Sequence, residues 1–349
     1  MNRFARVASS AWSRSTGYTP VNTTSYHRAS NSSRLMASTG LVAGAALITA
    51  YPIACEQADT SPRLVTELPS DLDLSKCEVT VYQFESCPFC RKARAVLDLA
   101  RIPYNVVEVN PLTKSETKSF ASDYKKVPIV VVHDGQRSYQ IRDSKVIIKA
   151  ILQAAKVTTG DSSRTRLPES SSLNAETILD AKAYEGLTVE DCWIKWVESY
   201  LLQLVVVNIY GTLDESRETF DYLLTHKDFG WVARSASYWL GSIVMHQVAR
   251  SRLKKFTDIQ GKHKQMFFDA CVDLGIKAGS AGGFLGGKKP CAADMNAYGV
   301  IRSLEGTRTL RDAIAGGAGP EFKAWYERMN LAVGDSQMKA KVNATQRGS

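Results

Sequence analysis

The sequence is short of cysteine, and this excludes one class of protein. Seven cysteines in 349 residues are too few for a disulfide scaffold. The sequence also lacks the internal repeats of a collagen or a solenoid. Because 44% of the residues are apolar and 23% are charged, the chain can bury an ordinary core and is not disordered as a whole. At roughly 150 residues per domain, its length predicts about two domains.

Acidic residues are absent from the first 55 positions. This stretch holds five arginines and no lysine, and the first carboxylate is Glu56. Without those arginines, the other 39 basic and 35 acidic residues leave a net charge of +4, against +9 for the whole chain. The basic character therefore belongs mainly to the N-terminal extension, and we expect no nucleic-acid partner.

The N-terminal extension contains two predicted targeting elements. Residues 1–34 are rich in arginine and serine, which is typical of a mitochondrial transit peptide, with a disordered basic tail as the alternative. Residues 35–55 contain no charge and are long enough to span a bilayer. We therefore expect a single membrane anchor and a mitochondrial location. A flexible linker and an endomembrane or Golgi location are the alternatives.

A pair of cysteines follows the first predicted strand. Residues 78–84 are β-branched and aromatic and predict a strand, whereas 91–99 have apolar residues at helical spacing. Between them lies the motif Cys87–Cys90, with sequence CPFC. At a helix N-terminus, unpaired N–H groups and the helix dipole lower a thiol pKa from about 8.5 to between 3.5 and 7.5. Basic residues in the first turns add positive charge; they are Arg91, Lys92 and Arg94.

The position of each sulfur predicts its role. We predict that Cys87, the better exposed, is the nucleophile, and that Cys90, one turn inside the helix, is the resolving or supporting thiol. An inert pair and half of a zinc site are the alternatives. A structural zinc needs four ligands, and no histidine lies near the motif, so we expect no metal.

The elements after the motif complete a recognisable order. The predicted segments are a strand at 104–109, a helix at 113–124, strands at 127–132 and 138–141, and a helix that begins at Asp143-Ser144. The order β-α-β-α-β-β-α, with a Cys-x-x-Cys at the first strand–helix junction, is that of the thioredoxin superfamily. We expect this α/β domain to cover residues 76–155, after a linker at 56–75.

Two further features of this domain suit a tripeptide ligand. Val127-Pro128 begins a strand and predicts a cis peptide whose exposed edge can pair with an extended peptide; an ordinary edge proline is the alternative. Asp143 and Ser144 cap a helix, whose N-terminus can also bind a carboxylate. Thiol, peptide edge and carboxylate site together match the parts of glutathione.

The second half of the chain is predicted to be helical. A Ser- and Thr-rich linker at 156–173 leads to an all-α domain at 174–335 and a tail at 336–349. The apolar run Leu201–Val207 is too short to span a membrane and suits a buried core helix. The predicted helices are 189–207, 216–224, 231–253, 258–277, 292–304 and 321–333. An α/β thioredoxin-like domain followed by such a domain has the layout of the glutathione transferases.

Four segments narrow the resemblance. They are TVYQFESCPFCRKARAVLDLARIPYNVVEVNPLTKSE, YKKVPIVVV, DSKVI and GGKKPCAADMNAYGVIRSLEG. Together they resemble the membrane-associated prostaglandin E synthase type 2 family over about residues 78–330. The resemblance implies a thiol-dependent isomerase that converts the lipid endoperoxide prostaglandin H2 to prostaglandin E2, with glutathione and in some cases haem bound, and it allows a homodimer.

The resemblance also implies roles for individual residues. The catalytic cysteine falls on Cys87, the main-chain glutathione contact on Val127 beside Pro128, and the γ-glutamyl contacts on Asp143 and Ser144. Two residues depart from the family pattern. Phe84 replaces a tyrosine, so a substrate-contacting hydroxyl is missing, and Cys291 replaces a better helix-capping asparagine.

The side chains of Phe84 and Phe89 are candidates for lining the substrate pocket. The alternative functions are a membrane-tethered thiol oxidoreductase of glutaredoxin or glutathione-transferase type, and a non-catalytic module that binds glutathione or haem.

Overall fold

The computed structural model describes residues 61–111, 113–166, 186–210 and 262–342. The expected transit peptide and membrane anchor lie outside the described residues, and so do two expected helices, 216–224 and 231–253. Among the helices of the described ranges, none is long and apolar enough to cross a membrane.

Strands and helices alternate in the first half, and helices dominate the second. The strands are β1 (Arg63–Leu64), β2 (Glu78–Gln83), β3 (Tyr104–Glu108), β4 (Ile129–His133), β5 (Ser138–Arg142) and β6 (Met338–Lys341). The α-helices are α2 (Pro88–Leu99), α3 (Lys118–Ala121), α4 (Ser144–Ala154), α5 (Val189–Trp196), α6 (Leu202–Tyr210), α9 (His263–Ala281), α10 (Ala292–Arg302), α11 (Arg308–Asp312) and α12 (Gly319–Val333). Short 3₁₀ turns are η1 (Leu74–Lys76), η2 (Ser115–Thr117) and η3 (Ser162–Arg164), and π-helical turns are η7 (Val197–Leu201) and η9 (Ala313–Gly317).

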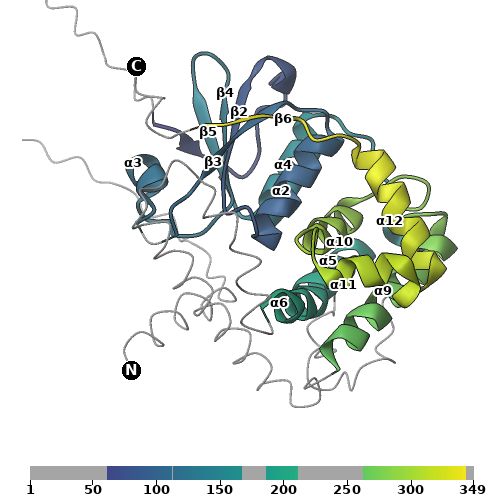
Figure 1. Ribbon diagram of the computed structural model, residues 1–349. Coiled ribbons are helices and arrows are strands. Elements are labelled where there is room, and N and C mark those ends of the chain that lie inside the picture. Colours follow the sequence, from purple (N-terminus) through teal and green to yellow (C-terminus); the bar gives the residue numbers. More distant parts are fainter. Residues whose placement is uncertain (1–60, 112, 167–185, 211–261, 343–349) are drawn as a thin grey trace, which may run out of the picture. The chain divides into compact units, whose positions relative to one another are not determined.

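Strand β2 lies inside a sheet with the order β1-β5-β4-β2-β3-β6. It runs parallel to β3 and antiparallel to β4, and Val81 lies between Val106 and Val130. Helices α2 and α4 cover one face of the sheet and α3 lies at the other (Figure 1). Because both faces are covered, every residue of β2 after Glu78 is buried, including the polar Thr80 and Gln83. The predicted thioredoxin-like order is confirmed as β2-α2-β3-α3-β4-β5-α4.

Two stretches expected to lie outside the domains contribute edge strands. Within the expected linker at 56–75, β1 pairs parallel with β5, and within the expected tail at 336–349, β6 pairs parallel with β3. Asp98 anchors β6 by accepting the Gln337 N–H at 2.8 Å. Both strands are short and mostly exposed, so they lack the apolar period that makes a strand visible in a sequence.

The predicted C-terminal helices are present where the structure describes them. The run predicted at 189–207 forms α5, η7 and α6, and the runs at 292–304 and 321–333 form α10 and α12. The prediction at 258–277 corresponds to α9, and its first residues lie outside the described ranges. In α6, every residue except Gln203 is buried, as the prediction of a core helix required.

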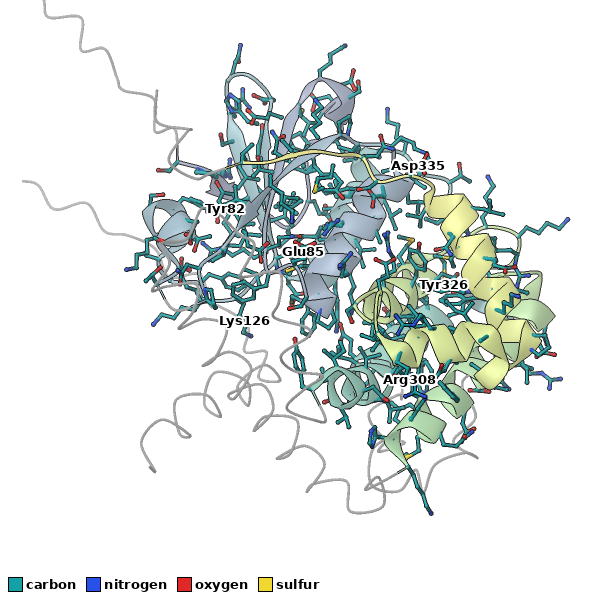
Figure 2. All side chains as sticks on the ribbon, viewed as in Figure 1. Tyr82, Glu85, Lys126, Arg308, Tyr326 and Asp335 are labelled. Atoms are coloured by element: carbon teal, nitrogen blue, oxygen red, sulfur yellow. The ribbon has the colours of Figure 1, made fainter. Side chains whose placement is uncertain are left out.

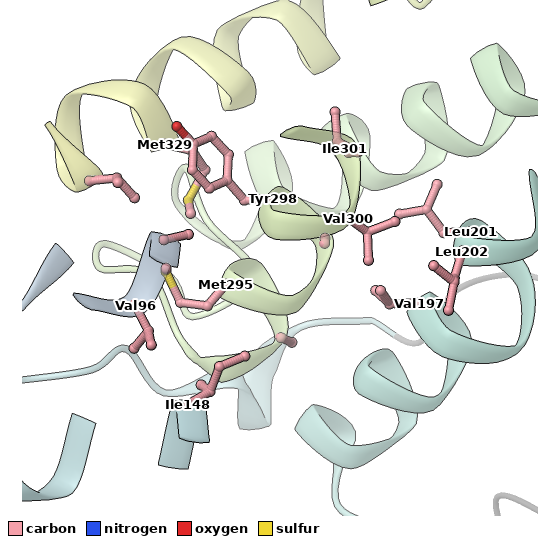
Figure 3. Packing of buried hydrophobic residues seen from close by; sticks show 14 of the residues in the cluster. Val96, Ile148, Val197, Leu201, Leu202, Met295, Tyr298, Val300, Ile301 and Met329 are labelled. Carbon is pink, nitrogen blue, oxygen red and sulfur yellow. The ribbon is translucent and has the colours of Figure 1, made fainter. Parts of the chain in front are cut away.

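Helix α10 is packed on several sides. Figure 3 shows its side chains Met295, Tyr298 and Val300 between residues of other helices. These neighbours include Val96 of α2, Ile148 of α4, Val197, Leu201 and Leu202 of η7 and α6, and Met329 of α12. Residues on both sides of the expected linker at 156–173 therefore belong to one apolar core.

Gly299 allows α10 to approach α2 closely. A Cβ atom at this position would lie 2.5 Å from the Lys92 Cα and 2.8 Å from its backbone N. Gly299→Ala is therefore expected to lower the free energy of unfolding by about 1–3 kcal/mol, the usual cost of overpacking. The measurement is the denaturant midpoint of the full-length protein. Gly279→Ala in α9 is the control, because its Cβ would meet no atom within 4 Å; an equal loss in both variants would contradict the prediction.

Candidate functional site

Three loops converge at one edge of the sheet. Strand β2 leads into Cys87, and its antiparallel neighbour β4 begins just after Val127; the pair Tyr82–Ile129 joins these two ends. Ile129 also pairs with Arg142, the last residue of β5 before Asp143. Figure 2 labels Glu85, next to the cysteine loop, and Lys126, next to Val127. The strand register therefore brings together the cysteines, the predicted peptide edge and the N-terminus of α4.

Cys87 is the N-cap residue of α2. Its N–H donates to the Phe84 carbonyl at 3.1 Å, and its carbonyl accepts the Arg91 N–H at 3.0 Å. Pro88 occupies the first helical position, where the absence of an N–H costs no hydrogen bond. Cys87 is half-buried, whereas Cys90 is fully buried one turn inside the helix. Cys87 is therefore the more exposed of the two, as the prediction of Cys87 as nucleophile and Cys90 as resolving thiol assumed.

The two thiols differ in acidity. The Cys90 thiol hydrogen-bonds to the Cys87 sulfur and is the largest cause of the lowered Cys87 pKa. Hydrogen bonds from the backbone N–H groups of Phe89 and Cys90 act in the same direction, against burial and the charge of Glu108. Burial, followed by the interaction with Cys87, raises the pKa of Cys90 well above its usual value. Of the two thiols, Cys87 is therefore the one that ionises more readily, and Cys90 the one that retains its proton more strongly.

The three basic residues of α2 do not supply the positive field that we expected at Cys87. Arg91 forms an ion pair with Glu305 at 3.1 Å, and Lys92 one with Glu198 at 3.5 Å. Arg94 donates to the Tyr104 hydroxyl at 3.4 Å. Arg91 also donates to the Glu85 carbonyl at 3.2 Å. The largest causes of the Cys87 pKa shift include none of these three side chains, so this part of the expectation was wrong.

Two charged residues that the sequence analysis missed interact with the cysteines. Glu108, at the end of β3, is buried and acts on both thiols electrostatically. Its carboxylate accepts the Glu85 N–H at 2.8 Å. Lys114 places its ammonium 4.5 Å from the centre of the Phe84 ring and interacts electrostatically with both cysteines. Burial lowers the pKa of Lys114. A carboxylate ending an apolar strand was the only signal in the sequence for Glu108.

The predicted peptide edge has the expected backbone geometry. The Val127–Pro128 peptide bond is cis. Both residues precede the first ladder pair of β4, so they lie at the end of the strand and outside its ladder. They stand beside the end of β2 from which the chain enters the cysteine loop.

The N-terminus of α4 forms the third part of the site. Asp143 is its N-cap and accepts the Lys145 N–H at 2.9 Å, which confirms the predicted helix cap. It has a φ of 74°, a conformation that aspartate tolerates better than most residues. Ser144 is buried in the first turn.

Tyr124 was not identified from the sequence. The Asp143 backbone donates a hydrogen bond to it, and its ring stacks against the Arg142 guanidinium, 5.1 Å away. Burial, and then the charge of Asp143, raise its pKa to about 12. Tyr124 therefore interacts with the N-cap residue of α4 and, electrostatically, with Cys90.

The two predicted pocket residues lie on either side of Cys87 in the sequence. Phe84 is half-buried below the Lys114 ammonium, and Phe89 is 5.5 Å from the Lys92 ammonium. Among the described residues, no cluster of three or more His, Cys, Asp or Glu side chains could hold a metal ion.

Cys90→Ala is expected to raise the Cys87 pKa, because it removes the donor that lowers that pKa most. In the wild type, alkylation of Cys87 by iodoacetamide is expected to reach half its maximal rate below pH 8.5, about the pKa of an ordinary cysteine. In Cys90→Ala, this midpoint moves to higher pH. Cys90→Ser is the matched control, because its hydroxyl can still donate; equal midpoints in the two variants would contradict this account.

Comparison with known proteins identifies relatives over most of the chain. The family described as "Glutathione S-transferase, N-terminal domain" matches residues 81–159. Prostaglandin E synthase 2 of Mus musculus is 31% identical over 337 residues, covering 89% of this chain and 85% of the mouse protein. Prostaglandin E synthase 2 of Danio rerio is 32% identical over 286 residues, covering 75% and 73%. A solved GST-like protein from Pseudomonas syringae is 16% identical with a TM-score of 0.44, covering 77% of this chain and 71% of the other.

Proposed function

The chain belongs to the prostaglandin E synthase 2 family, and on this premise we propose that it is a glutathione-binding isomerase that converts prostaglandin H2 to prostaglandin E2. The observation that carries the proposal is the Cys87 sulfur, which stands at the N-terminus of α2 with a lowered pKa. The reaction needs a nucleophile but no net oxidant, because the product is an isomer of the substrate.

The residues present at the sheet edge fit glutathione. The backbone at Val127 would pair with the extended tripeptide, as an added strand does. Asp143 would accept a hydrogen bond from the γ-glutamyl amino group. The N-terminal turn of α4, with Ser144, would donate to its carboxylate. This arrangement would hold the glutathione sulfur near Cys87.

The thiolate would open the endoperoxide. Attack on one peroxide oxygen forms an S–O bond and breaks the O–O bond. Loss of the proton from the carbon that bears the sulfur-linked oxygen then forms the ketone and expels the thiolate. The Cys87 thiolate, or a glutathione thiolate bound beside it, would act as this nucleophile.

Haem, which the resemblance also implies, does not enter this mechanism. His133 hydrogen-bonds to Arg137 and Ser138 and pairs with Glu78, at the end of β4 opposite Val127. In the family, the resemblance implies that the glutathione sulfur binds haem. His133 lies at the opposite end of β4 from Val127, so its imidazole is remote from the place where that sulfur would be held. Each step above uses only residues at the cysteine edge of the sheet.

The second candidate function is general thiol–disulfide exchange. The hydrogen bond between the Cys90 thiol and the Cys87 sulfur favours it, because two such sulfurs can form a disulfide and cycle with glutathione. A third candidate is a non-catalytic module, which would retain glutathione or haem without turnover.

The location of the chain is the same for all three candidate functions. The N-terminal extension would target the chain to mitochondria, or to an endomembrane, and residues 35–55 would anchor it in the membrane. Each of the three functions is compatible with a homodimer.

Product analysis tests the proposal. The purified full-length chain is incubated with prostaglandin H2, with and without glutathione, and the isomeric products are separated by liquid chromatography and then detected by mass spectrometry. Prostaglandin E2 is expected to form faster than in protein-free buffer containing the same thiol. Rapid reduction of hydroxyethyl disulfide with no gain in prostaglandin E2 would favour the second candidate, and tight glutathione binding without either activity the third.

A further inference from the structure

A buried tyrosine of the helical region reaches the cysteine loop. Tyr210 ends α6 and is 3% exposed. Its phenol oxygen is hydrogen-bonded by the side chain of Ser86, the residue immediately before Cys87, and it interacts electrostatically with the Cys87 thiolate. In Figure 1, α6 lies below the lower end of α2, which is the end that follows the cysteine loop.

Tyr210 supplies a phenol hydroxyl near the cysteine loop, in which Phe84 stands where the resemblance implies a tyrosine. Phe84 provides only a ring, which the Lys114 ammonium covers. The other phenol, Tyr124, accepts a hydrogen bond from the Asp143 backbone at the start of α4, whereas Tyr210 accepts one from Ser86, next to Cys87. Burial raises the pKa of Tyr210, and the neighbouring thiolate acts in the same direction. The phenol therefore keeps its proton at neutral pH and has one to donate.

We propose that Tyr210 is the proton donor and acceptor of the isomerisation, acting opposite the Cys87 thiolate. This inference rests on the proposed function. When the sulfur bonds to one peroxide oxygen, the electron pair of the breaking O–O bond passes to the other oxygen. That oxygen takes the Tyr210 proton and becomes the hydroxyl of the product.

The second half of the reaction restores both groups. The Tyr210 phenolate removes the hydrogen from the carbon that bears the sulfur-linked oxygen. The electron pair of that C–H bond forms the carbonyl, and the S–O bond breaks with its pair returning to sulfur. The net change moves one proton from carbon to oxygen and consumes no co-reactant.

Two reactions that both use the Cys87 thiol, the isomerisation and the reduction of hydroxyethyl disulfide, distinguish an acid–base role of Tyr210 from a structural role. In full-length Tyr210→Phe, kcat for prostaglandin E2 formation is expected to fall about 100-fold, the usual contribution of a positioned acid–base group, with KM within about twofold. Reduction of hydroxyethyl disulfide is expected to change less than about twofold, because that reaction needs the Cys87 thiolate and not the phenol. Tyr200→Phe is the matched control. Tyr200 lies in η7, its hydroxyl is also buried, and its ring packs against the ring of Trp196.

Each outcome has a distinct meaning. An unchanged kcat in Tyr210→Phe, with an active wild type, overturns the inference and leaves the proposed function standing. Parallel losses of isomerisation and disulfide reduction also overturn it, since they indicate a structural role. A wild type that reduces the disulfide but forms no prostaglandin E2 overturns the proposed function, and the inference with it.

Discussion

Replacing Cys87 with serine is expected to lower the rate of prostaglandin E2 formation by a factor on the order of 1,000 or more, as the loss of a nucleophile does. A serine hydroxyl keeps its proton at neutral pH, so neither the Cys90 donor nor the N–H groups of α2 would have an anion to stabilise. The measurement is the initial rate with prostaglandin H2 and dithiothreitol as the only added thiol. Glutathione binding, followed by calorimetry, is expected to persist, because Val127, Asp143 and Ser144 are unchanged.

Cys77→Ser is the matched control for this experiment. Cys77 is half-buried, burial raises its pKa, and its sulfur donates to the Asp73 carbonyl, which a hydroxyl can also do. This variant is expected to keep the wild-type rate. Undiminished turnover in Cys87→Ser would exclude Cys87 as the nucleophile. A loss with dithiothreitol that glutathione restores would transfer the role to the glutathione sulfur.

The parts of the site that could be predicted are determined by residues that are adjacent in the sequence. The Cys87–Cys90 motif lies between a β-branched strand and a helix with apolar spacing, so its place at a helix N-terminus follows from neighbouring residues. The cap at Asp143 and the peptide bond at Val127–Pro128 are likewise set by adjacent residues. These are the features that the structure reproduces.

The parts that could not be predicted depend on contacts distant in sequence. Neither the position of Glu108 beside the thiols nor the approach of Tyr210 to Ser86 leaves a local pattern, because each is created by tertiary packing. The basic residues of α2 illustrate the reverse error. Charge near a motif suggested that Arg91 lowers the Cys87 pKa, but its guanidinium binds the Glu305 carboxylate and the Glu85 carbonyl and is not among the main causes of that shift.

Asp294 carries more buried hydrogen bonds than any sequence pattern suggested. The resemblance implied only that it follows a capping position, where Cys291 was expected to be a poor cap. In the structure, the Asp294 carboxylate accepts the N–H groups of Leu285, Gly286 and Cys291 at 2.9–3.0 Å. The indole N–H of Trp325 in α12 donates to it at 2.9 Å. Burial raises the Asp294 pKa, and these donors oppose that shift. One side chain therefore joins the start of α10, the preceding loop and α12.

Asp294→Ala is expected to lower the free energy of unfolding by about 3–5 kcal/mol, because it leaves several buried donors without an acceptor. The measurement is the urea midpoint, followed by tryptophan fluorescence. Asp161→Ala is the control: Asp161 caps η3 from an exposed position, where water can replace it, and its loss is expected to cost about 1 kcal/mol or less. Since α10 packs directly on α2, the Asp294 variant is also expected to lose the low Cys87 pKa at lower urea concentration than the wild type does. A stable Asp294→Ala protein would show that the four donors find other acceptors and that α10 holds its place against α2 without this carboxylate.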